Sequence, residues 1–174
     1  MIYNFKIVTI NKDYCNYLRT FDEKDSYNFG NKENRPYVGI LFKLNNVEYF
    51  APLSSPKSKH LKMKNTIDFL KLDSGKLGAI NFNNMIPVTN ANYTLISFDN
   101  ISKSPAELKY IILLKNQLAA INTNYFEIID KSCRLYDLYI TNRLPKNIKD
   151  RCCNFPLLEE KCMEYNEGKI LQEV

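Results

Sequence analysis

The feature that most constrains the fold of this chain is a change in hydrophobic pattern roughly 100 residues from its start. Up to that point, apolar, β-branched and aromatic residues form short runs that are typical of strands. Beyond it, apolar residues recur at intervals of three and four, which is typical of helices. Strands followed by helices predict an α+β domain built on an antiparallel sheet. The length of 174 residues fits one such domain.

Most of the first 100 residues are predicted to be strand or loop. The pair Asn45-Asn46 tolerates positive φ and predicts a two-residue hairpin turn. Polar composition predicts a long loop over 22–36 and a lysine-containing loop over 54–65. In the first strand, alternation places Phe5 and Ile7 on one face and Lys6 and Val8 on the other. The predicted strands are residues 4–10, 37–44, 47–53, 67–72, 77–82 and 93–97.

Helix-start signals and apolar periodicity predict four helices. Asn11 predicts the start of a helix over 12–21, and Ser104-Pro105-Ala106-Glu107 is a capping-box start for a second. Further helices are predicted over 125–142 and from Pro156 onward. We therefore expect a single domain over 1–174. It would be β-rich over 1–100, helix-rich over 101–167 and frayed over 168–174.

The charge distribution favours a polyanionic partner. The net charge is +5, and the excess lies entirely in residues 1–64, which hold 11 basic and 6 acidic side chains. The densest group is Lys57, Lys59, Lys62 and Lys64, with His60, the only histidine, among them. A surface of one sign attracts nucleic acid. The alternative is a solvated loop in a mildly basic protein.

Cysteine spacing argues against a disulfide framework and against a zinc site. The chain has five cysteines, an odd number, and none are spaced as Cys-x-x-Cys. We expect inert thiols and no cofactor. No apolar run approaches the roughly 18 residues of a membrane helix, and the first ten residues lack a signal-peptide pattern. The expectation is a cytoplasmic protein with no membrane partner.

The segment Ser54-Ser55-Pro56-Lys57 follows a predicted strand and is a candidate phosphate-binding turn. Pro56 restricts Ser55 to an extended conformation, which places Lys57 near the two hydroxyls. Hydroxyl groups donate hydrogen bonds to a phosphate, and an ammonium group adds charge. A capped turn or an ordinary surface patch would explain the same residues.

Several sequence blocks in this chain resemble the ToxN/AbiQ/CptN family of type III toxin–antitoxin toxins, most closely the AbiQ/CptN branch. The blocks are YVGI at 37–40, YFAPLSSPKSKH at 49–60, LGAIN at 77–81, MIP at 85–87 and CNFPLLEEK at 153–161. The resemblance implies a metal-independent endoribonuclease with a compact, twisted antiparallel sheet surrounded by helices, as in MazF-like toxins. It also implies inhibition by a small RNA pseudoknot that the toxin cuts from tandem repeats. Toxin and RNA would alternate in a closed ring, such as three of each, and the substrates would be cellular and phage mRNA.

The residue inventory is compatible with cleavage in which the RNA's own 2′-hydroxyl attacks the neighbouring phosphorus. That reaction needs proton transfer and stabilisation of a dianionic phosphorane. One histidine excludes a two-histidine acid–base pair within a protomer, and no carboxylate cluster suggests a magnesium site. By resemblance, Ser55 is the key active-site serine, Ser54 the preceding hydroxyl residue and Lys57 the following lysine. His60 matches a family histidine. As a surface residue among lysines it would be neutral near pH 7, and it would act as a base or orient the loop.

The family also places a tyrosine and a lysine in the 22–36 loop. Counting back from residue 37 puts the lysine at Arg35 and the tyrosine at Asn31, a departure from the family pattern. Tyr27 and Lys32 are the alternatives within the loop. The remaining candidates for RNA binding are Tyr14, for which core packing is the other explanation, Lys59, Lys62, Lys64 and Asn81, which would otherwise cap the following turn.

Two other functions fit the same residues. The departures at Asn31 and Arg35 favour an RNA-binding module with a decayed active site. A basic loop is also compatible with an adaptor that binds an acidic protein. Both RNA-based hypotheses predict binding that weakens with salt, and only the enzyme predicts cyclic-phosphate products in the presence of EDTA.

Overall fold

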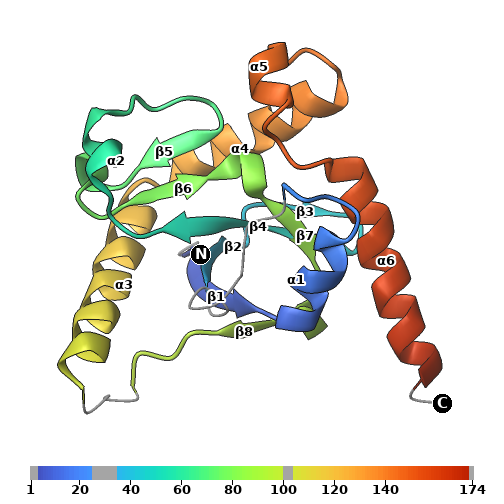
Figure 1. Cartoon of the computed structure of the whole chain (residues 1–174), viewed down its shortest axis with the longest axis horizontal. Coiled ribbons are helices and arrows are strands. Elements are labelled where there is room, and N and C mark those ends of the chain that lie inside the picture. Colours follow the sequence, from blue (N-terminus) through green and yellow to red (C-terminus); the bar gives the residue numbers. More distant parts are fainter. Residues whose placement is uncertain (1–3, 25–34, 100–103, 173–174) are drawn as a thin grey trace.

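The structure is a computed structural model that describes residues 4–24, 35–99 and 104–172. It shows a curved antiparallel sheet with helices on its flanks, and α3 (Pro105–Thr123) and α6 (Phe155–Gln172) stand on opposite sides of it (Figure 1). The predicted α+β class and antiparallel sheet are therefore confirmed.

The sheet has eight strands in the described residues, and the longest of them, β4, connects all its parts. The path runs β5-β6-β4-β2-β1-β8, and both β3 and β7 also pair with β4. Tyr37 of β2 lies opposite Pro52, while Ala79 of β6 lies opposite Ser54. The strands are β1 Lys6–Ile10, β2 Pro36–Gly39, β3 Lys43–Leu44, β4 Val47–Ser54, β5 Phe69–Lys71, β6 Ala79–Asn81, β7 Ile86–Val88 and β8 Tyr93–Leu95.

The predicted hairpin is present, but its first strand is interrupted. Asn45 has φ 52°, as the predicted turn requires, and β3 pairs with β4 directly around it. The predicted strand over 37–44 is divided into β2 and β3, and residues 40–42 belong to neither. A Cβ at Gly39 would lie 2.2 Å from the Phe50 ring, so glycine allows that ring to cover the backbone there. Strand β7 was not predicted as a separate strand.

Helix starts agree well with the sequence signals. The Asn11 side chain accepts hydrogen bonds from the amides of Asp13 and Tyr14 at the start of α1 (Lys12–Arg19). Ser104 Oγ accepts from the Glu107 amide at 3.2 Å at the start of α3. The other predicted helices are α4 (Tyr125–Ile140) and α6, which is helical to Gln172 rather than to 167. Two short helices, α2 (Ser58–Lys62) and α5 (Lys146–Lys149), were not predicted.

Both faces of the sheet are covered along the first strand. Ile7 and Val8 are adjacent and would point to opposite faces, yet each is at most 2% exposed. On one face, Tyr49 packs against Tyr136 of α4 and Phe155 of α6. On the other, Phe50 packs against Tyr93. A strand covered on both sides carries apolar residues on both, so Val8 is buried although it shares a face with the exposed Lys6.

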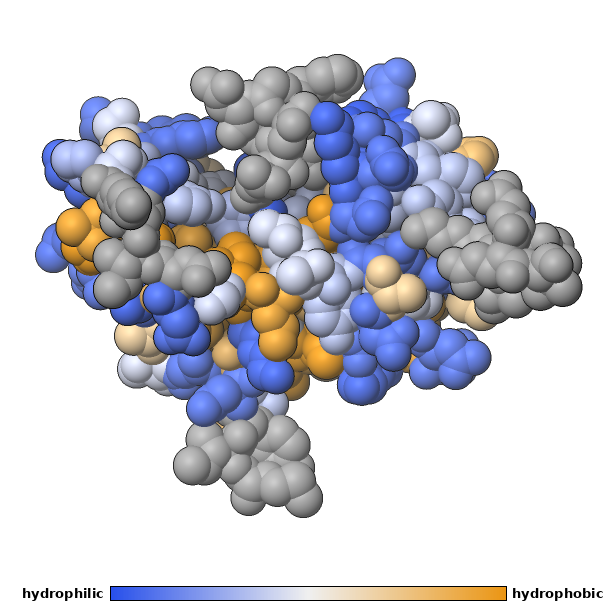
Figure 2. All heavy atoms as spheres, turned by 90° about the horizontal axis from the view of Figure 1, so that it is seen from below, coloured by the Kyte–Doolittle hydropathy of each residue, from blue (hydrophilic) through white to orange (hydrophobic). Residues whose placement is uncertain are grey.

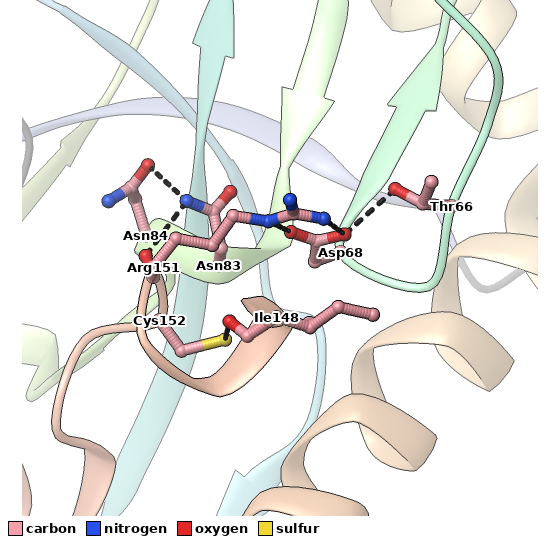
Figure 3. Close-up of polar contacts among 7 residues, drawn as sticks. All are labelled: Thr66, Asp68, Asn83, Asn84, Ile148, Arg151 and Cys152. Atoms are coloured by element: carbon pink, nitrogen blue, oxygen red, sulfur yellow. Dashed lines mark hydrogen bonds and ion pairs between the residues drawn. The ribbon is translucent and has the colours of Figure 1, made fainter. Parts of the chain in front are cut away.

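An ion pair joins the segment between α5 and α6 to the sheet. Arg151 donates from Nε to Asp68 Oδ2 at 2.5 Å and from Nη2 to Oδ1 at 2.9 Å, and Thr66 donates to the same carboxylate (Figure 3). Asn83 donates to the Arg151 carbonyl. Burial opposes ionisation of Asp68, but the hydrogen bonds from Arg151 and Thr66 outweigh it and lower the pKa of this carboxyl.

Candidate active site

The candidate site begins where β4 ends, and a buried scaffold holds that strand end. Ser54 is 7% exposed, and its Oγ accepts a hydrogen bond from Asn81 Nδ2 at 2.7 Å. Its carbonyl accepts one from Gln117 Nε2 of α3 at 3.3 Å, and the same amide nitrogen donates to the Leu77 carbonyl at 2.7 Å. Since Asn81 fills an acceptor site on Ser54 Oγ, the hydroxyl hydrogen of Ser54 remains available as a donor.

Gly78 permits the chain before β6 to approach this strand end closely. Its φ is +91°, and a Cβ there would lie 1.9 Å from the Ser54 carbonyl oxygen. Only glycine combines that backbone conformation with that distance. Neither Gly78 nor Gln117 was predicted from the sequence as a site residue. The sequence did contain a signal for Gln117. It lies three residues after Leu114 and four before Ile121, so it is a polar residue on the apolar side of a helix.

The residues after the scaffold are exposed. Ser55, Pro56 and Lys57 are all solvent-accessible, and Lys57 is extended, with φ −137° and ψ 147°. The predicted loop over 54–65 therefore contains a helix, because the Lys57 carbonyl accepts from the His60 amide at 2.9 Å and α2 follows directly. The site thus presents a hydroxyl and an ammonium group on a short turn between two regular elements.

Arg35 lies at the same end of the sheet. Arg35 directly precedes β2, and the start of β2 lies beside the end of β4, because Tyr37 pairs with Pro52 in antiparallel register. The side chain of Arg35 is partly exposed. The antiparallel pairing thus brings Arg35 and Ser54, two predicted site residues, to the same end of the sheet. A guanidinium group at that position suits a phosphate oxygen pair.

His60 is buried, which corrects the expectation of a surface histidine. It is 2% exposed, its ring lies 5.8 Å from that of Phe69, and Gly75 packs against its backbone. Its Nδ1 has no hydrogen-bond partner among the described residues. Burial, followed by the charges of Lys57 and Lys59, lowers the pKa of His60. The side chain is therefore neutral near pH 7, and its position favours orienting the turn over contact with RNA.

Lysines continue the positive surface away from the turn. Lys59, Lys62 and Lys64 are all exposed on α2 and just after it. The tertiary structure also brings a short 3-10 helix, η2 (Asp73–Gly75), against α2. Asp73 is exposed there, so the lysine group has one acidic neighbour that the sequence did not suggest. The surface remains predominantly cationic and suits several phosphate groups.

Of the remaining candidates, Tyr14 lies in the interior and Asn81 contacts Ser54. Tyr14 is fully buried, and its hydroxyl donates to the Pro87 carbonyl at 2.5 Å while its ring lies 5.1 Å from Tyr165. This is the core-packing role considered for Tyr14, and no part of its side chain is accessible to RNA. Asn81 does not cap the following turn, because its amide binds Ser54. Tyr27, Asn31 and Lys32 lie outside the described residues.

Across residues 4–24, 35–99 and 104–172, no three or more His, Cys, Asp or Glu side chains converge as a metal site. None of the five cysteines, all of which lie in the described residues, forms a disulfide, and all but Cys133 are buried. In the same ranges, no helix has the length and apolar character needed to span a membrane.

Comparison with known proteins places this fold among the toxins of type III toxin–antitoxin systems. The family model "Toxin ToxN, type III toxin-antitoxin system" matches residues 6–163. The chain belongs to this family.

The sequences of known relatives align with almost the whole length of the chain. Endoribonuclease ToxN of Bacillus thuringiensis subsp. kurstaki is 34% identical over 98% of this chain and 89% of its own length. Endoribonuclease AbiQ of Lactococcus lactis subsp. lactis is 28% identical over 96% of this chain and 92% of its own length. A solved structure from a study of selective toxin inhibition by a non-coding RNA pseudoknot superimposes with a TM-score of 0.79. It is 34% identical and covers 95% of this chain and 99% of that chain.

Proposed function

We propose that the chain is a metal-independent endoribonuclease toxin that cuts RNA by attack of a 2′-hydroxyl on the adjacent phosphorus. The observation that carries this proposal is the exposed Ser55–Lys57 turn, which follows the buried Ser54 that Asn81 and Gln117 hold by hydrogen bonds. The names of the relatives, which are endoribonucleases, support the reaction class.

The proposed reaction needs no reactant other than the RNA itself. The 2′-oxygen loses its proton to a base and forms a bond to phosphorus, and a phosphorane with two negative charges develops. The bond from phosphorus to the 5′-oxygen then breaks, and that oxygen takes up a proton. The products are a 2′,3′-cyclic phosphate and a 5′-hydroxyl. Lys57 stabilises the phosphorane, while Ser55 positions the phosphate or relays a proton.

The other residues support these two. Arg35, which directly precedes β2 beside the end of β4, neutralises a phosphate oxygen. We assign Ser54 a supporting role, in which its hydroxyl donates a hydrogen bond to the phosphate. His60 is buried and therefore orients the turn instead of contacting the substrate. Lys59, Lys62 and Lys64 bind the flanking phosphates.

We propose an RNA antitoxin as the partner, consistent with the pseudoknot inhibition described for the similar toxin. The antitoxin would be processed from tandem repeats by the toxin. It would occupy the cleavage groove with its processed end in a closed ring, such as three toxins with three RNAs. Free toxin would cut cytoplasmic cellular and phage mRNA, as expected for a relative of AbiQ, an anti-phage endoribonuclease.

The direct test is product analysis with purified protein in excess EDTA. We expect cleavage with 2′,3′-cyclic phosphate and 5′-hydroxyl ends, detected by mass spectrometry and by labelling with a kinase specific for 5′-hydroxyls. Products with 5′-phosphates, or a requirement for Mg²⁺, would contradict the mechanism. Salt-sensitive RNA binding without any cleavage would instead support the non-catalytic alternative. RNA binding that is absent altogether would favour the protein adaptor.

The antitoxin assignment is tested separately in cells. A frameshift in the repeat region leaves RNA folding intact, so we expect protection from the toxin to persist. Mutations that break the pseudoknot stems should release toxicity, and compensatory changes that restore pairing should suppress it again. Protection lost through the frameshift alone would indicate a protein antidote.

A further inference from the structure

Two sides of the molecule differ in what they offer to RNA. The side that includes β8 has apolar residues at its centre and hydrophilic residues around them (Figure 2). Helix α2 lies at the end of the molecule away from β8 (Figure 1), and Lys59 and Lys62 are exposed on it. Because phosphates bind to cationic surfaces, further contacts to RNA are expected around α2 rather than around β8.

The segment 75–78, which precedes β6, lies beside the turn that carries the predicted motif. A Cβ at Gly78 would lie 3.0 Å from the carbonyl carbon of Ser55. At the other end of the segment, a Cβ at Gly75 would lie 2.8 Å from the backbone carbonyl of His60. The two contacts occur in reversed order along the chain, so the segment and the turn run side by side in opposite directions.

This arrangement places Lys76 next to the stretch that contains Lys57. Lys76 lies between the two glycine contacts, just as Lys57 lies between Ser55 and His60, and both lysines are exposed. The lysines that form ion pairs within the described residues are others, namely Lys43, Lys131 and Lys161. In that part of the chain, no carboxylate therefore neutralises the ammonium group of Lys76.

The backbone around Lys76 is fixed by its own hydrogen bonds. The Leu72 amide donates to the Gly78 carbonyl at 3.0 Å, and the Lys76 amide donates to the Asp73 carbonyl at 2.9 Å. Asp73 and Ser74 have φ 46° and 53°, values that are uncommon for residues other than glycine and that persist only where the surrounding structure imposes them. The backbone of Lys76 is thus held in place beside the turn before any ligand binds.

We propose that Lys76 binds the RNA phosphate next to the one that Lys57 stabilises during cleavage. Each nucleotide of a single strand carries one negative charge, so two neighbouring ammonium groups suit two successive phosphates. Lys76 holds the strand in register with Ser55 and takes no part in the bond changes. This proposal rests on the proposed function, since it assigns Lys76 to the RNA that is cut at the turn.

The test measures affinity for RNAs in which one linkage at a time is uncharged. A 2′-deoxy sugar at the mapped cleavage position prevents reaction. A methylphosphonate with a 2′-deoxy sugar on its 5′ side replaces one linkage, and the same deoxy RNA with an ordinary phosphate is the reference. We expect one of the two linkages that flank the cleaved one to show a loss of about 5- to 30-fold, between the values for an exposed ion pair and for a hydrogen bond to a charged group. No loss at either linkage would overturn the proposal.

Three variants connect this loss to Lys76. Lys76→Gln should bind the reference RNA as weakly as wild-type protein binds the methylphosphonate RNA, and it should show no further loss at that linkage. Lys76→Arg keeps the charge and should keep the loss. Lys109→Gln, which changes an exposed lysine of α3, is the matched control and should behave as wild type. A full loss at that linkage in Lys76→Gln, or its absence in Lys76→Arg, would contradict a phosphate contact through the charge of Lys76.

Kinetics separate this role from a catalytic one. With all-ribose RNA, Lys76→Gln should raise KM by about the same factor and leave kcat within about 3-fold of wild type, because the contact is equal in the ground state and the transition state. A loss in kcat larger than the rise in KM would place Lys76 on the phosphorane and overturn the proposal. Failure of the proposed function would appear differently, as wild-type protein that binds these RNAs and does not cut the all-ribose substrate.

Discussion

The two ends of β4 use polar side chains in opposite ways. Near its start, Tyr49 donates to Glu159 of α6 at 2.5 Å, and Tyr136 donates to the same carboxylate oxygen at 2.7 Å. Burial and the Glu159 charge raise the pKa of both phenols, so both remain neutral donors. At its other end, Ser54 is held by Asn81 and Gln117. There the strand leads into the exposed Ser55.

The difference shows how one strand serves both stability and chemistry. The polar groups of Tyr49, Tyr136 and Glu159 satisfy each other inside the protein, so changing them affects folding first. At the other end, Asn81 and Gln117 hold Ser54 by hydrogen bonds, and the next residue, Ser55, is exposed. Changes in the turn should therefore affect the reaction and leave the fold intact. The following predictions test this contrast, from the largest expected effect to the smallest.

Removing the exposed groups should have the largest effect on activity. We expect Ser55→Ala and Lys57→Ala each to lower kcat/KM for RNA cleavage about 10²- to 10³-fold, because each removes a preorganised donor to the phosphorane. Thermal unfolding should be unchanged, since both side chains are exposed. Lys109→Ala is the charge-matched control. Wild-type cleavage rates in folded Ser55→Ala and Lys57→Ala would contradict the assignment.

Adding one methyl group to the scaffold should affect both properties. Gly78→Ala combines φ +91° with a backbone clash at Ser54, and we expect a loss of about 2–4 kcal/mol in the free energy of unfolding. Gly168→Ala is the matched control, because a Cβ there meets nothing within 4 Å and alanine favours helix. Urea denaturation measures both. Equal stability of the two variants would mean that the close approach at Ser54 is not required.

The start of β4 should show the converse behaviour. We expect Tyr49→Phe to cost about 1.5–3 kcal/mol of stability, because Glu159 loses a buried hydrogen bond to its charged group. The kcat of the folded fraction should stay at the wild-type value. Tyr110→Phe, which changes a tyrosine that is 42% exposed, should be close to neutral. A large loss of kcat in folded Tyr49→Phe would show that the two ends of β4 are coupled.

The buried His60 should make the free energy of unfolding depend on pH. Burial and the neighbouring lysines lower its pKa in the folded state below the ordinary value of 6.5. The unfolded chain therefore binds the proton first, and the stability contribution of neutral His60 is complete above pH 6.5 and declines as pH falls through the folded pKa. Urea denaturation from pH 7.5 to 5.5 measures this decline. His60→Gln should flatten it, and an equal decline in that variant would place the titration elsewhere.

The smallest effect is expected for single lysines on the positive surface. Lys62→Gln should weaken RNA affinity a few-fold and reduce the slope of log affinity against log salt by about 0.7, without a change in cleavage position. Binding measured at several salt concentrations tests this. A shifted cleavage position would mean that Lys62 reads sequence as well as charge.

Local signals predicted those parts of the fold that depend on neighbouring residues. Asn11 and Ser104 mark helix starts, and Asn45 adopts the positive φ of its turn, because caps and turns are formed within a few residues. The burial of Val8 and the division of the strand at Gly39 were not predicted. Both depend on side chains from distant segments that pack against them.

The sequence by itself determined the α+β class, the helix starts and the Ser54–Lys57 motif, since period, capping and motif spacing are properties of contiguous residues. Only the tertiary structure decided which motif residues are accessible. It placed His60 and Tyr14 inside, left Ser55 and Lys57 outside, and brought Gln117 to the Ser54 carbonyl. Burial and long-range hydrogen bonds depend on residues far apart in the chain, and a single sequence does not encode those distances in any local pattern.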